Sequence, residues 1–180
     1  LVGSGAREVA IAKQIKKSGS FLSLFCVAPS TNPQIKNLTT SYFEQPLNET
    51  EAVVGVAKKL SVDLAIIGPE GPLEIGLVDA LEKEGILCVG PRKNVARIET
   101  SKAFARNIID LCDAGKNPER MEFSSLRGVR GFLKHLNGHY VIKYDGLMGG
   151  KGVKISGEHL HSVEESLSYA KSIVDGGGTF

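Results

Sequence analysis

The sequence VIKYDGLMGGKGV at residues 141–153 combines short apolar segments with an intervening loop of glycine and lysine. Tyr140–Ile142 is predicted to form a buried strand and Val153–Ile155 a second strand, because both are short runs of β-favouring residues. The loop between them contains the glycines Gly146, Gly149, Gly150 and Gly152. This is more glycine than a simple turn requires, and it indicates a flexible hairpin loop with a function.

Lysines stand at both ends of this loop. Lys143 ends the first predicted strand, and Lys151 lies among the last glycines. Glycines allow backbone N–H groups to approach an anion without a clash from Cβ, and lysine ammonium groups suit phosphate oxygens as point charges. The loop is therefore predicted to cover a phosphate. The alternative is an ordinary hairpin with solvated lysines, since glycine-rich hairpin loops are common.

Two well-known classes of phosphate site do not match this loop. A Walker A motif, G-x-x-x-x-G-K-[ST], has Ser or Thr after its lysine and leads into a helix, whereas Gly152 and Val153 follow Lys151. The protein-kinase motifs H-R-D and D-F-G do not occur in the sequence. The sequence therefore excludes a P-loop and a protein kinase.

A second candidate phosphate site lies at the start of the chain. Leu1–Val2 reads as a strand, Gly3–Glu8 as a glycine turn, and Glu8–Lys17 as a helix with one apolar face. A helix N-terminus offers free N–H groups and the positive end of the helix dipole. A dinucleotide is not expected, because Glu8 replaces the third glycine of G-x-G-x-x-G and no acidic residue ends the strand Leu22–Ala28. The turn suits a single phosphate on a small substrate, or it is a plain tight turn.

The first half of the chain alternates strand and helix patterns. Apolar runs at Leu22–Val27, Leu64–Ile67 and Ile86–Val89 read as strands that are buried on both faces of a sheet. With Leu1–Val2 they give four strand–helix steps in about ninety residues, which predicts an α/β fold with an open parallel sheet. Ligands of such sheets bind beyond the carboxyl ends of the strands. Gly68–Gly71 follows the third strand at such an end and is a second candidate substrate loop.

Helix signals mark the other elements of the chain. Asn48 and Glu51 look like a capping pair for a helix that ends near Leu60. Ser162 begins a capping box, S-V-E-E, for a helix that runs to Val174. The remaining predicted elements are a helix at Leu73–Glu84, a helix from Thr100 or Ser101 to Asp113, a strand at Met121–Phe123 and a helix at Leu126–Leu136.

Composition narrows the class of protein. The 180 residues carry a net charge of +2 with scattered lysines and arginines, which favours neither nucleic acid nor membrane as a partner. Cys26, Cys88 and Cys112 lack the spacing of a zinc site, and the first two are expected to be buried free thiols. No apolar run is long enough to span a membrane and no signal peptide is visible, so a cytoplasmic protein is expected. The chain begins without methionine and ends as a strand begins at Thr179–Phe180, so we expect it to be part of a longer protein.

Four segments in the same order resemble one family of ligases. They are GSGAREVAIA from Gly3, IIGPEGPLEIGLVDAL from Ile66, GPRKNVARIETSKAFAR from Gly90 and VIKYDGLMGGKGVKI from Val141. They are similar to the first turn, the third strand with its helix, the passage into the ATP-grasp part and the phosphate-covering hairpin of the phosphoribosylamine–glycine ligase family. That family, the glycinamide ribonucleotide synthetases, belongs to the ATP-grasp superfamily.

The resemblance implies a domain plan and a reaction. The plan has a Rossmann-like α/β substrate domain at 1–93, a connecting helix at 94–116 and the ATP-grasp small subdomain at 117–180. The carboxylate of glycine would attack the γ-phosphate of ATP to give glycyl phosphate. The amine of 5-phosphoribosylamine would then displace phosphate to give glycinamide ribonucleotide for purine synthesis. A monomer that uses ATP with Mg²⁺ or Mn²⁺ is expected, with its catalytic and metal-binding residues beyond Phe180 and no metal ligand in this chain.

The resemblance also implies a role for each candidate residue. Lys102 and Lys143 would hold the α and β phosphates of ATP. The β and γ phosphates would be covered by Gly146, Gly149, Gly150, Lys151 and Gly152. The ribose phosphate would be held by Gly3, Ser4, Gly5, Arg7 and Glu8. The second substrate loop would consist of Gly68, Pro69, Glu70 and Gly71, with the Glu70 carboxylate placed for the ribose hydroxyls or the amine.

Each of these roles has a structural alternative. Glu70 could only cap the helix that follows it, and Arg7 could pair with solvent or with Glu8. Without the resemblance, Lys102 would read as a solvated helix lysine. Two other functions stay open: another ATP-grasp ligase or carboxylase of purine synthesis, and a nucleotide-binding module without ligase activity.

The sequence departs from the family pattern at three places. The family usually has histidine where Val9 stands. Its hairpin more often has alanines where Met148 and Gly149 stand, and Asp113–Phe123 replaces a short G-I-P-T join. The predicted domain boundary near Asn117 lies within this unusual segment.

Overall fold

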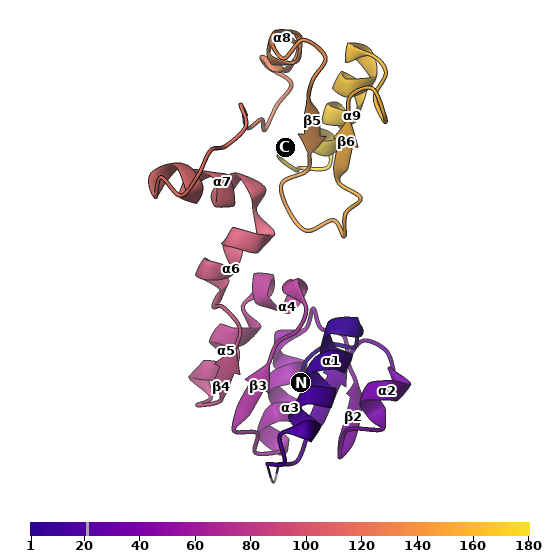
Figure 1. Cartoon of the computed structure of the whole chain (residues 1–180), viewed down its shortest axis with the longest axis vertical. Helices are drawn as coiled ribbons and strands as arrows, with labels where there is room; N and C mark the ends of the chain where they lie inside the picture. Colours follow the sequence, from indigo (N-terminus) through magenta and orange to yellow (C-terminus); the bar gives the residue numbers. More distant parts are fainter. Residues whose placement is uncertain (21) are drawn as a thin grey trace. The chain divides into compact units, whose positions relative to one another are not determined.

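The structure is a computed structural model that describes residues 1–20 and 22–180 (Figure 1). The chain forms two compact units, residues 1–97 and 98–180. The elements of the first unit are α1 (Ala6–Lys17), β1 (Phe25–Ala28), α2 (Pro33–Lys36), β2 (Ser41–Glu44), α3 (Thr50–Lys59), β3 (Leu64–Ile66), α4 (Glu70–Ile75), α5 (Leu77–Lys83) and β4 (Leu87–Val89). Helix α6 (Lys93–Thr100) crosses the division, and the second unit contains α7 (Lys102–Leu111), α8 (Val129–His135), β5 (Val141–Lys143), β6 (Val153–Ile155) and α9 (Val163–Asp175).

The first unit contains a parallel sheet whose two halves meet at Val2. Strand β1 pairs with β2 and β3 pairs with β4, both in parallel. Between these pairs, Val2 forms parallel bridges to Val27 and to Ile67. Its N–H donates to Ile66 O at 2.9 Å, and its carbonyl accepts from Gly68 N at 3.0 Å. The order across the sheet is therefore β2, β1, Val2, β3, β4, which confirms the predicted open parallel sheet.

Helices cover both faces of this sheet. Side chains of α3 and α5 form one apolar core with alternate residues of the strands, which comprises Val2, Val27, Val53, Ala57, Ala65, Ile67, Leu77, Val78, Leu81 and Ile86. Side chains of α1 and α2 form the other core, which comprises Ala12, Leu24, Cys26, Ala28 and Ile35. Because Val27 and Cys26 alternate along β1, they point to opposite faces. This two-sided burial explains why the sequence of β1 is a continuous apolar run. In β3 and β4 only one face is covered in this way, and Leu64, Leu87 and Val89 are exposed.

Four details of the first unit differ from the sequence-based predictions. Strand β2 and the single-turn helix α2 were not predicted. The residue before α3 is Glu49, which makes no side-chain capping bond, so the predicted Asn48–Glu51 capping pair is wrong. The predicted helix Leu73–Glu84 is two helices, because Gly76 adopts a left-handed conformation with φ +91°. The thiol of Cys26 is buried as predicted, whereas Cys88 is only half-buried.

The second unit is a hairpin packed against two helices. Strands β5 and β6 pair antiparallel, with Lys143 opposite Val153. The core between the hairpin and helices α8 and α9 comprises Val129, Leu133, Tyr140, Ile142, Leu160, Ala170 and Ile173. The predicted two-stranded hairpin is confirmed. Ser162 caps α9 as predicted, because its Oγ accepts from Glu165 N at 3.0 Å.

Two predictions for the second unit are corrected. Met121–Phe123 is not a strand, although Phe123 exchanges two backbone hydrogen bonds with Phe180, at 2.8 and 3.1 Å. Helix α8 begins at Val129 and not at Leu126, because Gly128 stands before it with φ +84°. In the connecting segment, α6 and α7 are separate helices, and Ser101 is the N-cap of α7.

Within the described ranges, 1–20 and 22–180, no helix combines the length and apolarity needed to cross a lipid bilayer.

Candidate functional site

The turns that follow Val2 and β3 lie next to each other in the first unit. Strands of a parallel sheet end at the same edge, so Gly3–Gly5 and Gly68–Pro69 both emerge there. A cleft of about 490 Å³ lies at this edge. It is lined by Gly3, Ser4, Gly5, Ala6, Arg7, Glu8, Pro29, Leu47 and Pro69, and is called the N-terminal cleft below. Helix α1 begins at Ala6, two residues before the predicted start, so its first turn faces the cleft.

Arg7 joins the two turns. Its Nη1 donates to Gly68 O at 2.8 Å, and its Nη2 donates to Glu70 Oε1 at 2.8 Å. The hydrogen bond from Arg7 lowers the pKa of the Glu70 carboxyl below its ordinary value. Both side chains are partly exposed, so the pair contributes little to stability and can exchange partners. Arg7 thus forms an ion pair with Glu70.

Glu8 is the buried acid of the cleft. Its side chain is 4% exposed, and its Oε2 accepts from Gly5 N at 2.5 Å. The carboxylate fills the space where side chains would lie at the neighbouring glycines. A Cβ at Gly3 would lie 3.0 Å from Glu8 Cδ, and a Cβ at Gly68 would overlap Glu8 Oε1. These glycines are therefore required by the packing of Glu8, in addition to any contact with a ligand.

Two residues outside the Gly3–Glu8 turn hold its backbone in place through hydrogen bonds. Asn32 Nδ2 donates to Ser4 O at 2.8 Å, and Cys26 Sγ donates to Gly3 O at 3.4 Å. Burial raises the pKa of the Cys26 thiol, which keeps it a neutral donor. The Gly5 N–H donates to the Glu8 carboxylate. The N–H groups in the first turn of α1 have no acceptor within the helix, because no helical turn precedes them. The cleft therefore combines the amides at the start of α1 with one arginine and a buried carboxylate.

The glycine loop of the hairpin forms the second candidate site. Tyr144 N donates to Gly152 O at 2.7 Å and closes the loop just beyond Lys143. Gly146, Gly149 and Gly150 have φ of +143°, +53° and +80°, a region that side chains with Cβ disfavour. Lys143 and Lys151 are both exposed. The loop therefore presents glycine backbone and two ammonium groups to solvent.

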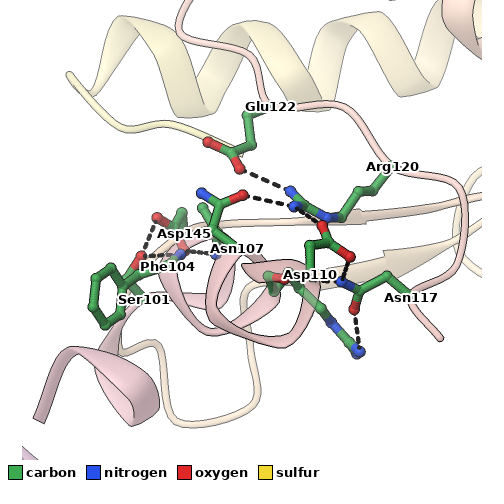
Figure 2. Close-up of polar contacts among 10 residues, drawn as sticks. Ser101, Phe104, Asn107, Asp110, Asn117, Arg120, Glu122 and Asp145 are labelled. Atoms are coloured by element: carbon green, nitrogen blue, oxygen red, sulfur yellow. Dashed lines mark hydrogen bonds and ion pairs between the residues drawn. The ribbon is translucent and has the colours of Figure 1, made fainter. Parts of the chain in front are cut away.

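Lys102 contacts this loop from helix α7. Its Nζ donates to Gly146 O at 2.9 Å, so it is not simply a solvated helix lysine. Next to it, Ser101 Oγ donates to Asp145 Oδ2 at 2.9 Å and accepts from Phe104 N at 3.1 Å, as Figure 2 shows. Sequence reasoning found the lysine and the cap but missed Asp145. An acidic residue between Lys143 and Gly146 in a basic loop was the available signal.

A separate polar network holds the segment after α7. Arg120 donates to Asn107 Oδ1 at 2.6 Å, to Asp110 Oδ2 at 2.8 Å and to Glu122 Oε1 at 2.9 Å (Figure 2). Asn117 donates to Asp110 Oδ1 at 2.6 Å. Hydrogen bonds from Arg120 and then Asn117 lower the pKa of the Asp110 carboxyl. This network fixes the unusual Asp113–Phe123 segment against α7.

The predicted residues are brought together in two groups. The turn residues Gly3–Glu8 meet Gly68–Glu70 in the first unit, and Lys102 meets the hairpin loop in the second. Across the described parts of the chain, no three His, Cys, Asp or Glu side chains are arranged to hold a metal ion.

Sequence comparisons place this chain in one family of known proteins. The family model described as "Phosphoribosylglycinamide synthetase, N domain" matches residues 1–99. A phosphoribosylamine–glycine ligase of Methanococcoides burtonii is 43% identical over 176 residues, which cover 98% of this chain and 40% of the relative. That of Pyrococcus abyssi is 38% identical over 174 residues. The chain spans about two-fifths of the length of these relatives.

Solved structures extend the comparison to the fold. The crystal structure of phosphoribosylamine–glycine ligase from Thermotoga maritima has a TM-score of 0.72 and 25% identity, and the match covers 99% of this chain and 41% of that one. An ADP complex of N5-carboxyaminoimidazole ribonucleotide synthetase has a TM-score of 0.75 at 14% identity, over 99% of this chain and 44% of that one. The second match shows the fold alone.

Proposed function

Because the chain belongs to the phosphoribosylglycinamide synthetase N-domain family, we propose that it is the substrate-binding and phosphate-covering part of a phosphoribosylamine–glycine ligase. A polypeptide of the relatives' length would join glycine to 5-phosphoribosylamine with conversion of ATP to ADP and phosphate. The observation that carries the proposal is the Arg7 bridge. It brings Gly68 and Glu70, more than sixty positions away, to the turn that the family resemblance assigns to the same substrate.

The N-terminal cleft would bind the phosphoribosyl group. Amides at the start of α1 suit the phosphate, because a helix N-terminus has free N–H groups and a favourable dipole. Arg7 is exposed enough to turn from Glu70 toward a phosphate, which accepts two parallel N–H bonds from a guanidinium. Glu70 would then be free to accept from ribose hydroxyls or from the amine. This exchange supports a cleft that takes a sugar phosphate bearing hydrogen-bond donors.

The hairpin unit would bind ATP through its lysines. Lys102 and Lys143 would hold the α and β phosphates, and Lys151 with the loop glycines would cover the β and γ phosphates. Phosphoryl transfer depends on positioning and charge neutralisation more than on covalent chemistry by the protein. Magnesium or manganese would supply further neutralisation, with ligands outside this chain. The enzyme would act as a cytoplasmic monomer on small molecules, with neither nucleic acid nor membrane as a partner.

The substrate that stimulates ADP release tests the proposal. In a full-length ligase that carries this chain, ADP release should require both glycine and 5-phosphoribosylamine. Stimulation by an aminoimidazole ribonucleotide and bicarbonate would instead indicate a carboxylase with the same fold. ATP binding without stimulation by either substrate pair would indicate a non-catalytic nucleotide-binding module. Residues 1–180 alone should catalyse no ligation, because the metal ligands would be missing.

A further inference from the structure

Asp145 joins three segments of the second unit. It lies, half-buried, between the end of β5 and the glycine loop. Its Oδ2 accepts from Ser101 Oγ at 2.9 Å (Figure 2). Its Oδ1 accepts from Ala103 N at 3.1 Å. Its own N–H donates to Thr179 O at 2.8 Å. One side chain therefore fixes the base of the loop to the start of α7, while its backbone is held by the turn after α9.

The bonds of Asp145 exceed what capping of α7 requires. Ser101 already serves as the N-cap, since its Oγ accepts from Phe104 N. Asp145 adds an acceptor from 44 positions away in the sequence and places a negative charge at the N-terminus of a ten-residue helix. The added bonds connect two segments that the cap alone would leave independent.

Lys102 and Lys143 are placed relative to each other by this connection. Lys102 follows the N-cap of α7, and its Nζ reaches Gly146 O, the residue after Asp145. Lys143 precedes Asp145 by two residues and ends β5. The two lysines assigned to the same phosphates therefore come from different elements, and the Asp145 carboxylate connects those elements through Ser101 and Ala103, in addition to the bond that Lys102 itself makes.

We propose that Asp145 is a positioning residue of the nucleotide site, which sets Lys102 against Lys143 and the base of the glycine loop. The inference rests on the proposed function, because it assumes that these lysines hold ATP phosphates. Asp145 acts through the lysines and the loop backbone. The base of the loop is held at Asp145, at Gly146 by Lys102 and at the Tyr144–Gly152 bond, and residues 147–151 extend beyond it.

The test compares Asp145→Ala and Asp145→Asn with Ser162→Ala in a full-length ligase that carries this chain. Asp145→Asn keeps the shape and one acceptor but removes the charge. Ser162→Ala is the matched control, because it removes the N-cap of α9 in the same unit without touching Lys102 or the loop. ADP affinity is measured by calorimetry, KM for ATP and for glycine by steady-state kinetics, and thermal unfolding by calorimetric scanning.

Asp145→Ala should weaken ADP binding and raise KM for ATP by about tenfold or more, since it removes the two charge-assisted hydrogen bonds, from Ser101 and Ala103, that hold the start of α7 at the loop. KM for glycine should stay within about twofold, and Asp145→Asn should be intermediate. Ser162→Ala should lower the unfolding temperature but leave ADP affinity unchanged. If Asp145→Ala does not fold, the ADP affinity of Asp145→Asn tests the positioning role instead.

Two outcomes have different meanings. Wild-type ADP affinity in folded Asp145→Ala or Asp145→Asn would overturn the positioning role, even if exchange of the Ala103 amide became faster. Failure of the wild-type protein to bind ADP would overturn the nucleotide assignment of the hairpin, and the proposed function with it.

Discussion

The substitution Gly68→Ala should destabilise the first unit through Glu8. The added Cβ would overlap Oε1 of a carboxylate that is 4% exposed and cannot move without leaving its site. Moving it breaks the bond from Gly5 N, and loss of a hydrogen bond to a charged group costs about 1.5–3 kcal/mol. We expect the free energy of unfolding to fall by about that amount.

Gly71→Ala is the matched control for this prediction. Gly71 stands three positions later in α4, and a Cβ there would meet no atom within 4 Å. Alanine is favoured over glycine in a helix, so the change should be neutral or stabilise the protein by up to about 1 kcal/mol. Urea unfolding, followed through the amide signals of residues 1–97, would measure both variants.

The Glu8→Ala background identifies the cause. Removing the carboxylate empties the space that the new methyl group needs, so Gly68→Ala should cost little more once Glu8→Ala has been made. The double-mutant cycle should therefore show a coupling energy close to the cost of the single Gly68→Ala change. Additive effects, or equal stability of Gly68→Ala and Gly71→Ala, would refute the reasoning.

Three further predictions concern the two sites. Lys143→Ala should lower kcat/KM for ATP by the equivalent of about 1.5–3 kcal/mol in steady-state kinetics at saturating glycine, and an unchanged value would contradict the assignment. Gly5→Val should impair use of 5-phosphoribosylamine more than ATP affinity by calorimetry, because its Cβ would lie 2.8 Å from Glu8 Oε2; equal losses would mean that the turn serves the nucleotide or the fold. Arg7→Ala should raise the pKa of Glu70 in a carboxyl NMR titration. The pKa of Glu70 is lower in the folded protein, so the small stabilisation by this exposed pair is present above the unfolded pKa and is lost as pH falls through the folded pKa. The same Glu70 titration in the wild type and in Arg7→Ala would argue against the ion pair.

The sheet could be predicted where its strands are short apolar runs. Leu64–Ile67 is such a run and contains β3, although Leu64 is 51% exposed. Ser41–Glu44 was missed because β2 is an edge strand with only half-buried or exposed side chains, so its sequence shows neither a run nor a clear alternation. The break at Gly76 was missed because an isolated glycine is compatible with a helix interior until packing selects the left-handed conformation.

The site could be predicted as segments but not as contacts. The glycine turns and the lysines are visible in the sequence, because they are local in character. Glu70, which pairs with the Arg7 side chain, and Ser101, which bonds to the Asp145 side chain, lie more than forty positions away from them, and such pairs depend on which segments meet in the fold. Glu8 was assigned to a substrate turn from the family resemblance, whereas its burial among Gly3, Gly5 and Gly68 became visible only with the fold.

The central place of Val2 in the sheet sets an order of events during translation. Its two partners are Val27 and Ile67, so the ribosome releases β1 and β2 well before the other side of Val2 can pair. A nascent chain that stops short of β3 therefore exposes one open, apolar edge, which is the kind of surface that chaperones bind. Release from a chaperone should coincide with the emergence of β3 from the ribosomal tunnel.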